Sequence, residues 1–276
     1  MVSRNPPREV LEILRKEVNF GCPVKGCGSP YLMHHHFDPP WRVKQHHNPE
    51  GMIALCPEHA LQADEDRWTK DQLREMKNNP YIKLGEVKDV YDYLRRNIVS
   101  DIGFIGYNIK NILEIDGERV IGFERDKEGY DRLNLLIRNE KMEPILVMEN
   151  NFWTVYSKNI FDLRCSAKGR ILEIISNDGI TKLSMRFDDY SLENFTKYLL
   201  KIAGTEIIKH LLMRMGNPKT IPVWKIRGDL KWGSSYIRIG DLFVEDLIKH
   251  NIVKSGFAVN CRSAFSFKKD GSMSFG

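Results

Sequence analysis

The chain has 276 residues, of which 42% are hydrophobic and 29% charged, so it can bury a core as one large domain or two ordinary ones. No apolar run reaches the length of a transmembrane helix and the charged N-terminal stretch lacks a signal-peptide core, so we expect a cytoplasmic protein without membrane contact. The net charge is +5, but residues 1–80 carry 11 basic and 11 acidic side chains, which excludes a strongly basic patch there.

The first part of the chain is predicted to contain three helices. Residues 6–18 place apolar side chains on one helical face and have Pro7 near the start. A loop-rich segment follows at about 21–55, and residues 59–68 again have helical spacing. Thr69 is predicted to cap a further helix, because Gln72 stands three residues later in a capping-box pattern.

After about residue 98 the pattern changes to short runs of alternating apolar and polar residues, which predict strands. These runs are ERVIGFER (118–125), DRLNLLIR (131–138), EPILVMENNFWTVY (143–156) and GRILEIISNDGITKLSMRF (169–187). Asp178-Gly179 within the last run predicts a hairpin turn. Helical spacing returns at 191–204, and shorter strand-like pieces close the chain.

The sequence therefore predicts an α+β protein with two domains. Residues 1–85 are expected to form a metal-dependent unit, and residues 86–276 a β-rich domain with a few helices. Residues 87–99, VKDVYDYLRRNIV, are compatible with a connecting helix between them.

Two short pairs of potential metal ligands are separated by 28 intervening residues: Cys22 with Cys27, and Cys56 with His59. Zinc is commonly bound by such pairs, because each pair grips one edge of a tetrahedral coordination sphere from a tight turn. An odd number of cysteines, five, without a secretion signal also argues for reduced thiols. We predict a structural zinc ion that contributes about 10 kcal/mol to ordering this segment.

Several histidines remain after this zinc site is filled. Residues 32–60 contain six of the eight histidines of the chain, and His59 accounts for one of them. The remaining side chains with potential chemistry in and just after this segment are His34, His35, His36, His46, His47, Asn48 and Asp64. This is more imidazole than one structural ion uses.

The stretch CPVKGC … LMHHHFDPP … HHNPEGMIALCPEHALQAD (residues 22–64) resembles the zinc-knuckled form of the ββα-metal, or HNH, nuclease family. The resemblance covers about residues 18–80. It implies a ββα-type unit, in which a His-His pair opens a short hairpin, an asparagine lies in its loop, and a helix follows the second knuckle.

The resemblance also implies roles for single residues. His35 takes the place of a metal ligand and His36 that of the general base, while Asn48 would hold the loop and orient the base. Ala60 stands where such proteins usually have a metal-binding histidine. Asp64, one helical turn later, occupies a position from which a second ligand can come.

Ala60 shifts the predicted substrate from DNA to RNA. DNA hydrolysis needs an activated water and a metal that stabilises the departing oxygen, whereas RNA supplies its own 2′ hydroxyl as nucleophile. We expect His36 to take the proton, and His35, His46 or His47 to protonate the leaving oxygen or stabilise the transition state, without a required Mg²⁺.

Arg42 and Lys44, between the histidine clusters, are expected to bind the phosphate. Two alternatives stay open. The first is an HNH DNA endonuclease that holds Mg²⁺ through His35 and Asp64. The second is a zinc-finger module that binds nucleic acid or protein without turnover.

Residues 86–276 contain no arrangement that looks catalytic. A small nuclease joined to a large noncatalytic part resembles, in layout, bacterial anti-phage effectors of the ring-activated zinc-finger RNase type. That resemblance implies a toxin that forms a homo-oligomer and cleaves RNA when a ring-shaped phage protein, such as a portal, triggers it. The β-rich domain would then be the sensor.

Overall fold

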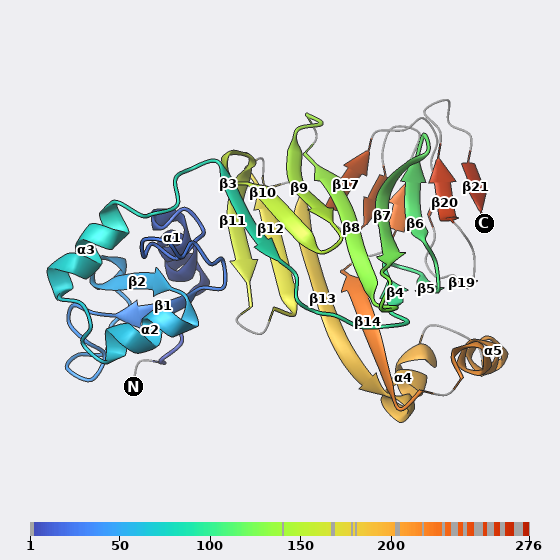
Figure 1. The fold of residues 1–276 in the computed structure, drawn as a ribbon, viewed down its shortest axis with the longest axis horizontal. Helices are drawn as coiled ribbons and strands as arrows, with labels where there is room; N and C mark the ends of the chain where they lie inside the picture. Colours follow the sequence, from blue (N-terminus) through green and yellow to red (C-terminus); the bar gives the residue numbers. More distant parts are fainter. Residues whose placement is uncertain are drawn as a thin grey trace. The chain divides into compact units, whose positions relative to one another are not determined.

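The computed structural model of the chain has an α+β fold with many strands and few helices, as predicted (Figure 1). Two compact units make up the chain: Met1–Asp89 with Thr154–Gly179, and Val90–Trp153 with Ile180–Gly276. The boundary expected after residue 85 stays a prediction. The structure describes residues 3–139, 141–166, 169–177, 179, 181–201, 205–216, 218–227, 230–232, 237–239, 242–245, 251–252, 257–259, 263–267 and 273–275.

The first unit is built around a short antiparallel pair of strands, in which His36 of β1 lies opposite Met52 of β2. This hairpin occupies the segment that periodicity alone predicts to be loop-rich, and helices lie around it (Figure 1). The elements of this part are α1 (Arg8–Glu17), β1 (Met33–His36), η1 (Pro49–Gly51), β2 (Met52–Leu55), α2 (Pro57–Asp64), α3 (Lys70–Asn78) and β3 (Glu86–Val90).

The predicted helices form with some changes of bounds: the helix expected at 59–68 begins earlier, at Pro57, and ends at Asp64. The Thr69 side chain accepts a hydrogen bond from the Gln72 amide, and the Gln72 side chain accepts one from the Thr69 amide, so the predicted capping box is present. Pro57 occupies the first turn of α2, where its missing N–H costs nothing.

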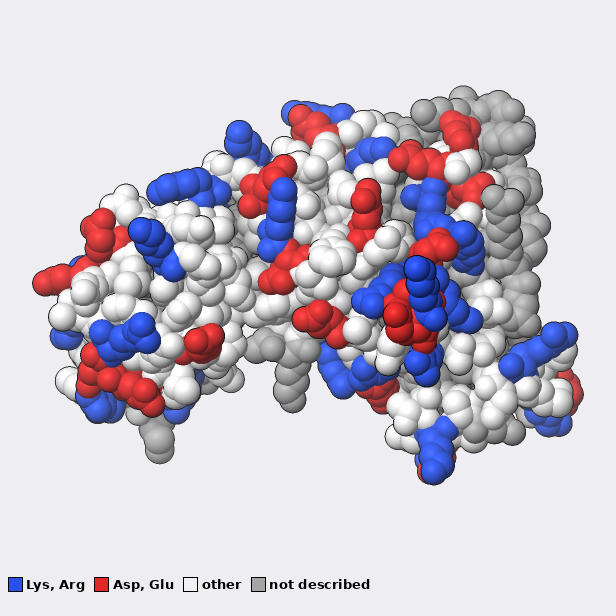
Figure 2. Space-filling model, viewed as in Figure 1, with Lys and Arg blue, Asp and Glu red and all other residues white. Residues whose placement is uncertain are grey.

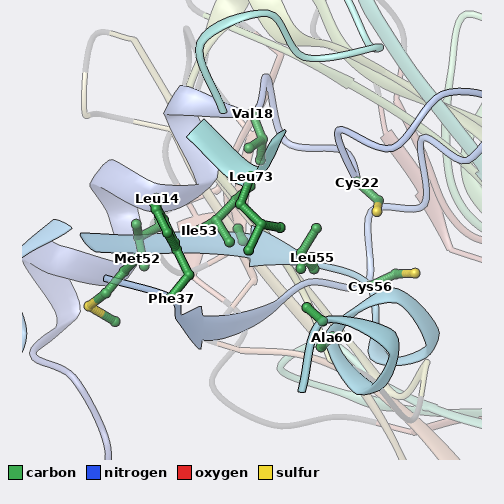
Figure 3. Packing of buried hydrophobic residues seen from close by; sticks show 12 residues of the cluster. Leu14, Val18, Cys22, Phe37, Met52, Ile53, Leu55, Cys56, Ala60 and Leu73 are labelled. Carbon is green, nitrogen blue, oxygen red and sulfur yellow. The ribbon is translucent and has the colours of Figure 1, made fainter. Parts of the chain in front are cut away.

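The core of this unit surrounds β2, whose four residues are all buried. Leu14 of α1 and Leu73 of α3 converge on Ile53, and all three side chains are at most 3% exposed (Figure 3). The sulfur atoms of Cys22 and Cys56 lie at one side of the same cluster. The core is small, so a metal ion bound at its border would contribute a large share of its stability.

A second hairpin contributes to the first unit although it is distant in sequence. Strands β11 (Ile160–Cys165) and β12 (Ile171–Ser176) pair antiparallel after the turn η2 (Ser157–Asn159). Arg15 of α1 donates two hydrogen bonds to the Asp162 carboxylate, at 2.9 and 2.7 Å, and both side chains are largely buried. This bidentate ion pair fixes α1 against β11.

The second unit is an assembly of antiparallel and parallel strands. Strands β6 to β9 form a meander, with β20 paired parallel to β6 and antiparallel to β21. In another sheet, β13 pairs with β14, β14 with β4, β4 with β5 and β5 with β19. The bounds are β4 (Val99–Asp101), β5 (Ile105–Tyr107), β6 (Asn111–Ile115), β7 (Glu118–Arg125), β8 (Asp131–Arg138), β9 (Pro144–Glu149), β13 (Lys182–Ser191), β14 (Thr220–Ile226), β19 (Phe257–Val259), β20 (Ser263–Phe267) and β21 (Met273–Phe275).

The remaining elements are the strands β10 (Phe152–Tyr156), β15 (Leu230–Trp232), β16 (Ile237–Ile239), β17 (Leu242–Glu245) and β18 (Asn251–Ile252), and the helices α4 (Leu192–Leu199) and α5 (Thr205–Met215). Helix α4 forms where helical spacing returns, and buries Phe195 and Leu199 against the sheet strands. Asp178, part of the predicted hairpin turn, lies outside the described residues.

The prediction of a connecting helix at residues 87–99 is wrong. The chain runs as strand β3 and then as an irregular stretch. Val87, Tyr91 and Tyr93 are buried while the residues between them are more exposed, which is the two-residue period of extended chain.

Within the described part of the chain, no helix has the length and apolar character needed to span a membrane. On the face drawn in Figure 2, basic and acidic side chains are interspersed. This face therefore offers no broad surface of one charge.

Candidate functional site

The four predicted zinc ligands come together. Their donor atoms all lie within 4.8 Å of one another. The His59 Nδ1 lies 3.3 Å from the Cys22 sulfur and 3.2 Å from the Cys56 sulfur, and the sulfurs of Cys27 and Cys56 are 3.8 Å apart. Tetrahedral zinc requires separations of about 3.8 Å between sulfurs and about 3.5 Å between sulfur and nitrogen, given its usual bond lengths. The cluster can hold a metal ion, and its donor set is compatible with zinc.

Tight turns place these ligands. Cys22 and Cys27 flank a loop in which the Cys27 amide donates to the Val24 carbonyl, and Gly26 has a φ of +85° that a side chain would disfavour. Cys56 is the N-cap of α2, so His59 follows in its first turn.

The environment of the thiols also suits a cation. Burial raises the pKa of Cys22 and of Cys56 above the usual value, so an isolated thiolate is disfavoured at either position. Zinc compensates thiolate charge directly. The four described cysteines, including the separate Cys165, are free thiols, as expected.

Most of the remaining histidines line a second feature, a pocket of about 580 Å³ in the first unit. The pocket draws residues from β1, from the loop after it, from α2 and from the N-terminal segment. Its lining includes Arg4, His34, His35, His36, Trp41 and Asp64. Ala60 lines it as well, so the position where a metal-binding histidine was expected does face this pocket.

His35 and Asp64 meet in the pocket. The His35 Nδ1 lies 3.1 Å from a carboxylate oxygen of Asp64, and the imidazole is largely buried while the carboxylate is exposed. Burial lowers the pKa of His35, and the Asp64 carboxylate opposes this shift by favouring the protonated ring. His35 and Asp64, which the sequence predicted to act together, are close enough to form an ion pair or to bind one metal ion together.

The ring of His36 is held in one orientation. Its Nε2 donates a hydrogen bond of 2.9 Å to the backbone carbonyl of His46, which leaves Nδ1 with the free lone pair. Burial lowers the pKa of His36 to about 4, against the effect of that hydrogen bond. The ring is therefore neutral at pH 7 and can accept a proton at Nδ1.

His46 and His47 are engaged with the backbone. The His46 Nε2 donates to the Pro39 carbonyl at 2.9 Å, and its Nδ1 accepts from the Asn48 amide at 3.1 Å. The His47 Nε2 donates to the Ser3 carbonyl at 2.8 Å. Both nitrogens of His46 are thus occupied in holding the loop.

Asn48 also serves this loop. Its side-chain oxygen accepts from the Glu50 amide and caps η1. The backbone amide of Asn48 donates to the ring of His46, and the carbonyl of His46 accepts from the base candidate His36. Asn48 therefore contacts the residue that binds His36.

No family model, curated protein or solved structure matches the chain. The geometry of the pocket and of the Cys/His cluster is therefore the basis for any functional assignment.

The two predicted phosphate-binding residues differ in position. Both Arg42 and Lys44 are exposed, but Arg42 belongs to the pocket lining and Lys44 does not.

Sequence reasoning did not assign roles to His34 or Trp41. Alternation along β1 could have found His34, because residues two apart share a face, and its ring lies 5.6 Å from that of His36. The Trp41 ring contacts His36 at 4.7 Å and stacks on His47 at 5.4 Å.

Gly51 closes the loop beneath these residues. Its carbonyl accepts from the amides of Phe37 and Asp38, and a Cβ at Gly51 would lie 1.9 Å from the Asp38 carbonyl oxygen and 3.1 Å from the His46 ring. Gly51→Ala is expected to destabilise the protein by about 1–3 kcal/mol, because the backbone must shift to remove the clash. Urea unfolding measures this change. Gly85→Ala is the matched control, since nothing lies within 4 Å of a Cβ there; equal stability of the two variants would contradict the prediction.

Proposed function

We propose that the chain is a zinc-stabilised endonuclease that cleaves RNA, with His36 as general base. The observation that carries the proposal is the orientation of His36 in the pocket, where the His46 carbonyl engages Nε2 and leaves Nδ1 as proton acceptor. The order of a β1–β2 hairpin followed by α2 next to a Cys/His cluster is compatible with the ββα-metal nuclease resemblance and supports the proposal.

The proposed reaction uses residues that line the same pocket. His36 takes the proton of the 2′ hydroxyl, and the 2′ oxygen attacks phosphorus. The bond from phosphorus to the 5′ oxygen breaks, and His35 gives a proton to that oxygen, which yields a 2′,3′-cyclic phosphate and a free 5′ hydroxyl. The Asp64 carboxylate, 3.1 Å away, favours the protonated form of His35 that this step requires.

Positively charged arginine side chains also assist the proposed reaction. Arg42 and Arg4 line the pocket and can bind the phosphate oxygens. A bound phosphodiester brings a negative charge, which raises the pKa of the imidazoles beside it and makes His36 a stronger base.

The second candidate is a divalent-metal DNA endonuclease. The contact of His35 with Asp64 favours it, because an imidazole nitrogen and a carboxylate oxygen 3.1 Å apart can bind one ion together. Ala60 supplies no third donor. Among the described residues, the Cys/His cluster is the one group of three or more His, Cys, Asp or Glu donors arranged for a metal.

Matched RNA and DNA oligonucleotides, each with magnesium or with EDTA, distinguish the candidates. The RNase proposal expects RNA cleavage without magnesium, and a block of cleavage when the scissile nucleotide carries a 2′-deoxy substitution. Magnesium-dependent DNA cleavage would replace the first proposal by the second. Binding of either oligonucleotide without cleavage would favour the zinc-finger binding module.

The proposal also includes predictions about how the nuclease is triggered and how the chain assembles. The β-rich part would act as the sensor of a ring-shaped phage protein, and the active form would be a homo-oligomer. If such a trigger is required, the comparison above has to be made in its presence.

A further inference from the structure

A buried lysine lies outside the histidine pocket, on the last turn of α3. The side chain of Lys77 is 9% exposed. Its ammonium donates to the backbone carbonyls of Pro49 and Met52, the second at 2.9 Å, and forms an ion pair of 3.0 Å with Glu17 of α1.

Burying the Lys77 ammonium costs free energy, which only specific contacts offset. A buried ammonium loses its hydration and is tolerated when a counter-charge and hydrogen-bond acceptors replace the water. Glu17 supplies the charge and the two carbonyls supply acceptors. A methionine has a similar length and no charge, so general packing of α3 does not by itself require a lysine.

The two carbonyls that Lys77 binds lie on either side of Gly51, at the end of the loop that holds the base. The carbonyl of Gly51 accepts hydrogen bonds from the backbone amides of Phe37 and Asp38, which follow β1 directly. The same loop begins with His46, whose carbonyl accepts from the His36 Nε2. Lys77 therefore fixes, through η1, the segment that orients His36.

We propose that Lys77 is a positioning residue for the histidine pocket: by holding the Pro49 and Met52 carbonyls it sets the loop that selects the tautomer and orientation of His36. This inference rests on the proposed function for its kinetic consequence, but its structural consequence at His36 is measurable without any activity.

The test compares Lys77→Met, Lys77→Arg and a control, Lys83→Met, at an exposed lysine. In Lys77→Met we expect a zinc content equal to that of the wild type and a kcat for RNA cleavage lowered on the order of 10²-fold, because a small displacement of a catalytic group has this effect. KM should change less than kcat, since the phosphate-binding residues are untouched. Lys77→Arg should recover most of the rate, because its guanidinium offers both hydrogen bonds and the charge.

The second readout is the ¹⁵N NMR spectrum of the His36 ring. The wild type should show the neutral tautomer protonated at Nε2, and Lys77→Met a mixture of tautomers, whereas Lys83→Met should match the wild type. If the wild type cleaves no RNA, this spectrum decides the role of Lys77 while the nuclease proposal fails. An unchanged His36 spectrum, an unchanged kcat, or a Lys77→Met protein that loses its zinc and fold would overturn the positioning role.

Discussion

Cys56→Ser is expected to lose the bound metal and, with it, the folded state of the first unit. The sulfur of Cys56 and the donor atoms of Cys22, Cys27 and His59 lie within 4.8 Å of one another, an arrangement that can hold one ion, and a serine hydroxyl is a poor substitute for a thiolate. A structural zinc contributes about 10 kcal/mol. That is comparable to the whole stability of an ordinary domain, about 5–15 kcal/mol, so the small core around β2 cannot compensate for its loss.

Zinc content by native mass spectrometry, together with amide exchange of β1 and β2, measures both parts of this expectation. The wild type treated with a strong chelator should behave in the same way. Cys165→Ser is the matched control, because Cys165 is an equally buried free thiol outside the cluster. A Cys56→Ser protein with full zinc content and protected strands would show that the cluster is not a structural metal site.

His36→Ala is expected to lower the rate of RNA cleavage by about 10²–10⁴-fold while zinc content and fold are preserved. The factor is the usual contribution of a positioned general base. His36 lies at the end of β1, with its Nε2 held by a backbone carbonyl, and it is not one of the clustered zinc donors. Single-turnover cleavage of an RNA oligonucleotide measures the effect on the chemical step directly.

His210→Ala provides the control for this experiment, since His210 is exposed on α5 and belongs to no pocket described above. His34→Ala is the critical comparison, because His34 shares a strand face with His36 and lines the same pocket. If His34→Ala abolishes cleavage and His36→Ala retains it, the assignment of the base has to move to His34.

Local patterns in the sequence predicted elements whose signals are complete within a few residues. The capping box of Thr69 and Gln72 is formed by neighbouring backbone and side-chain groups. The strand at 131–138 follows the alternation of apolar residues, whereas the strand at 118–125 has four consecutive buried residues, 120–123. The Cys/His cluster was predictable for a similar reason, because short pairs of ligands in tight turns already limit the possible geometry. The helix predicted at residues 87–99 does not form, because Val87, Tyr91 and Tyr93 are buried at the even spacing of extended chain.

The spacing of cysteine and histidine residues predicted the Cys/His cluster, and left the other histidines of residues 32–60 as candidates for chemistry. The hydrogen bonds of these histidines follow from the tertiary fold: both nitrogens of His46 bind backbone groups, whereas His36 donates through Nε2 to the His46 carbonyl, which leaves Nδ1 as an acceptor. The same holds for Lys77, which reaches carbonyls 25 and 28 residues earlier in the chain. Hydrogen bonds of this kind depend on where distant segments meet when the core packs, and no local pattern of residues records that meeting.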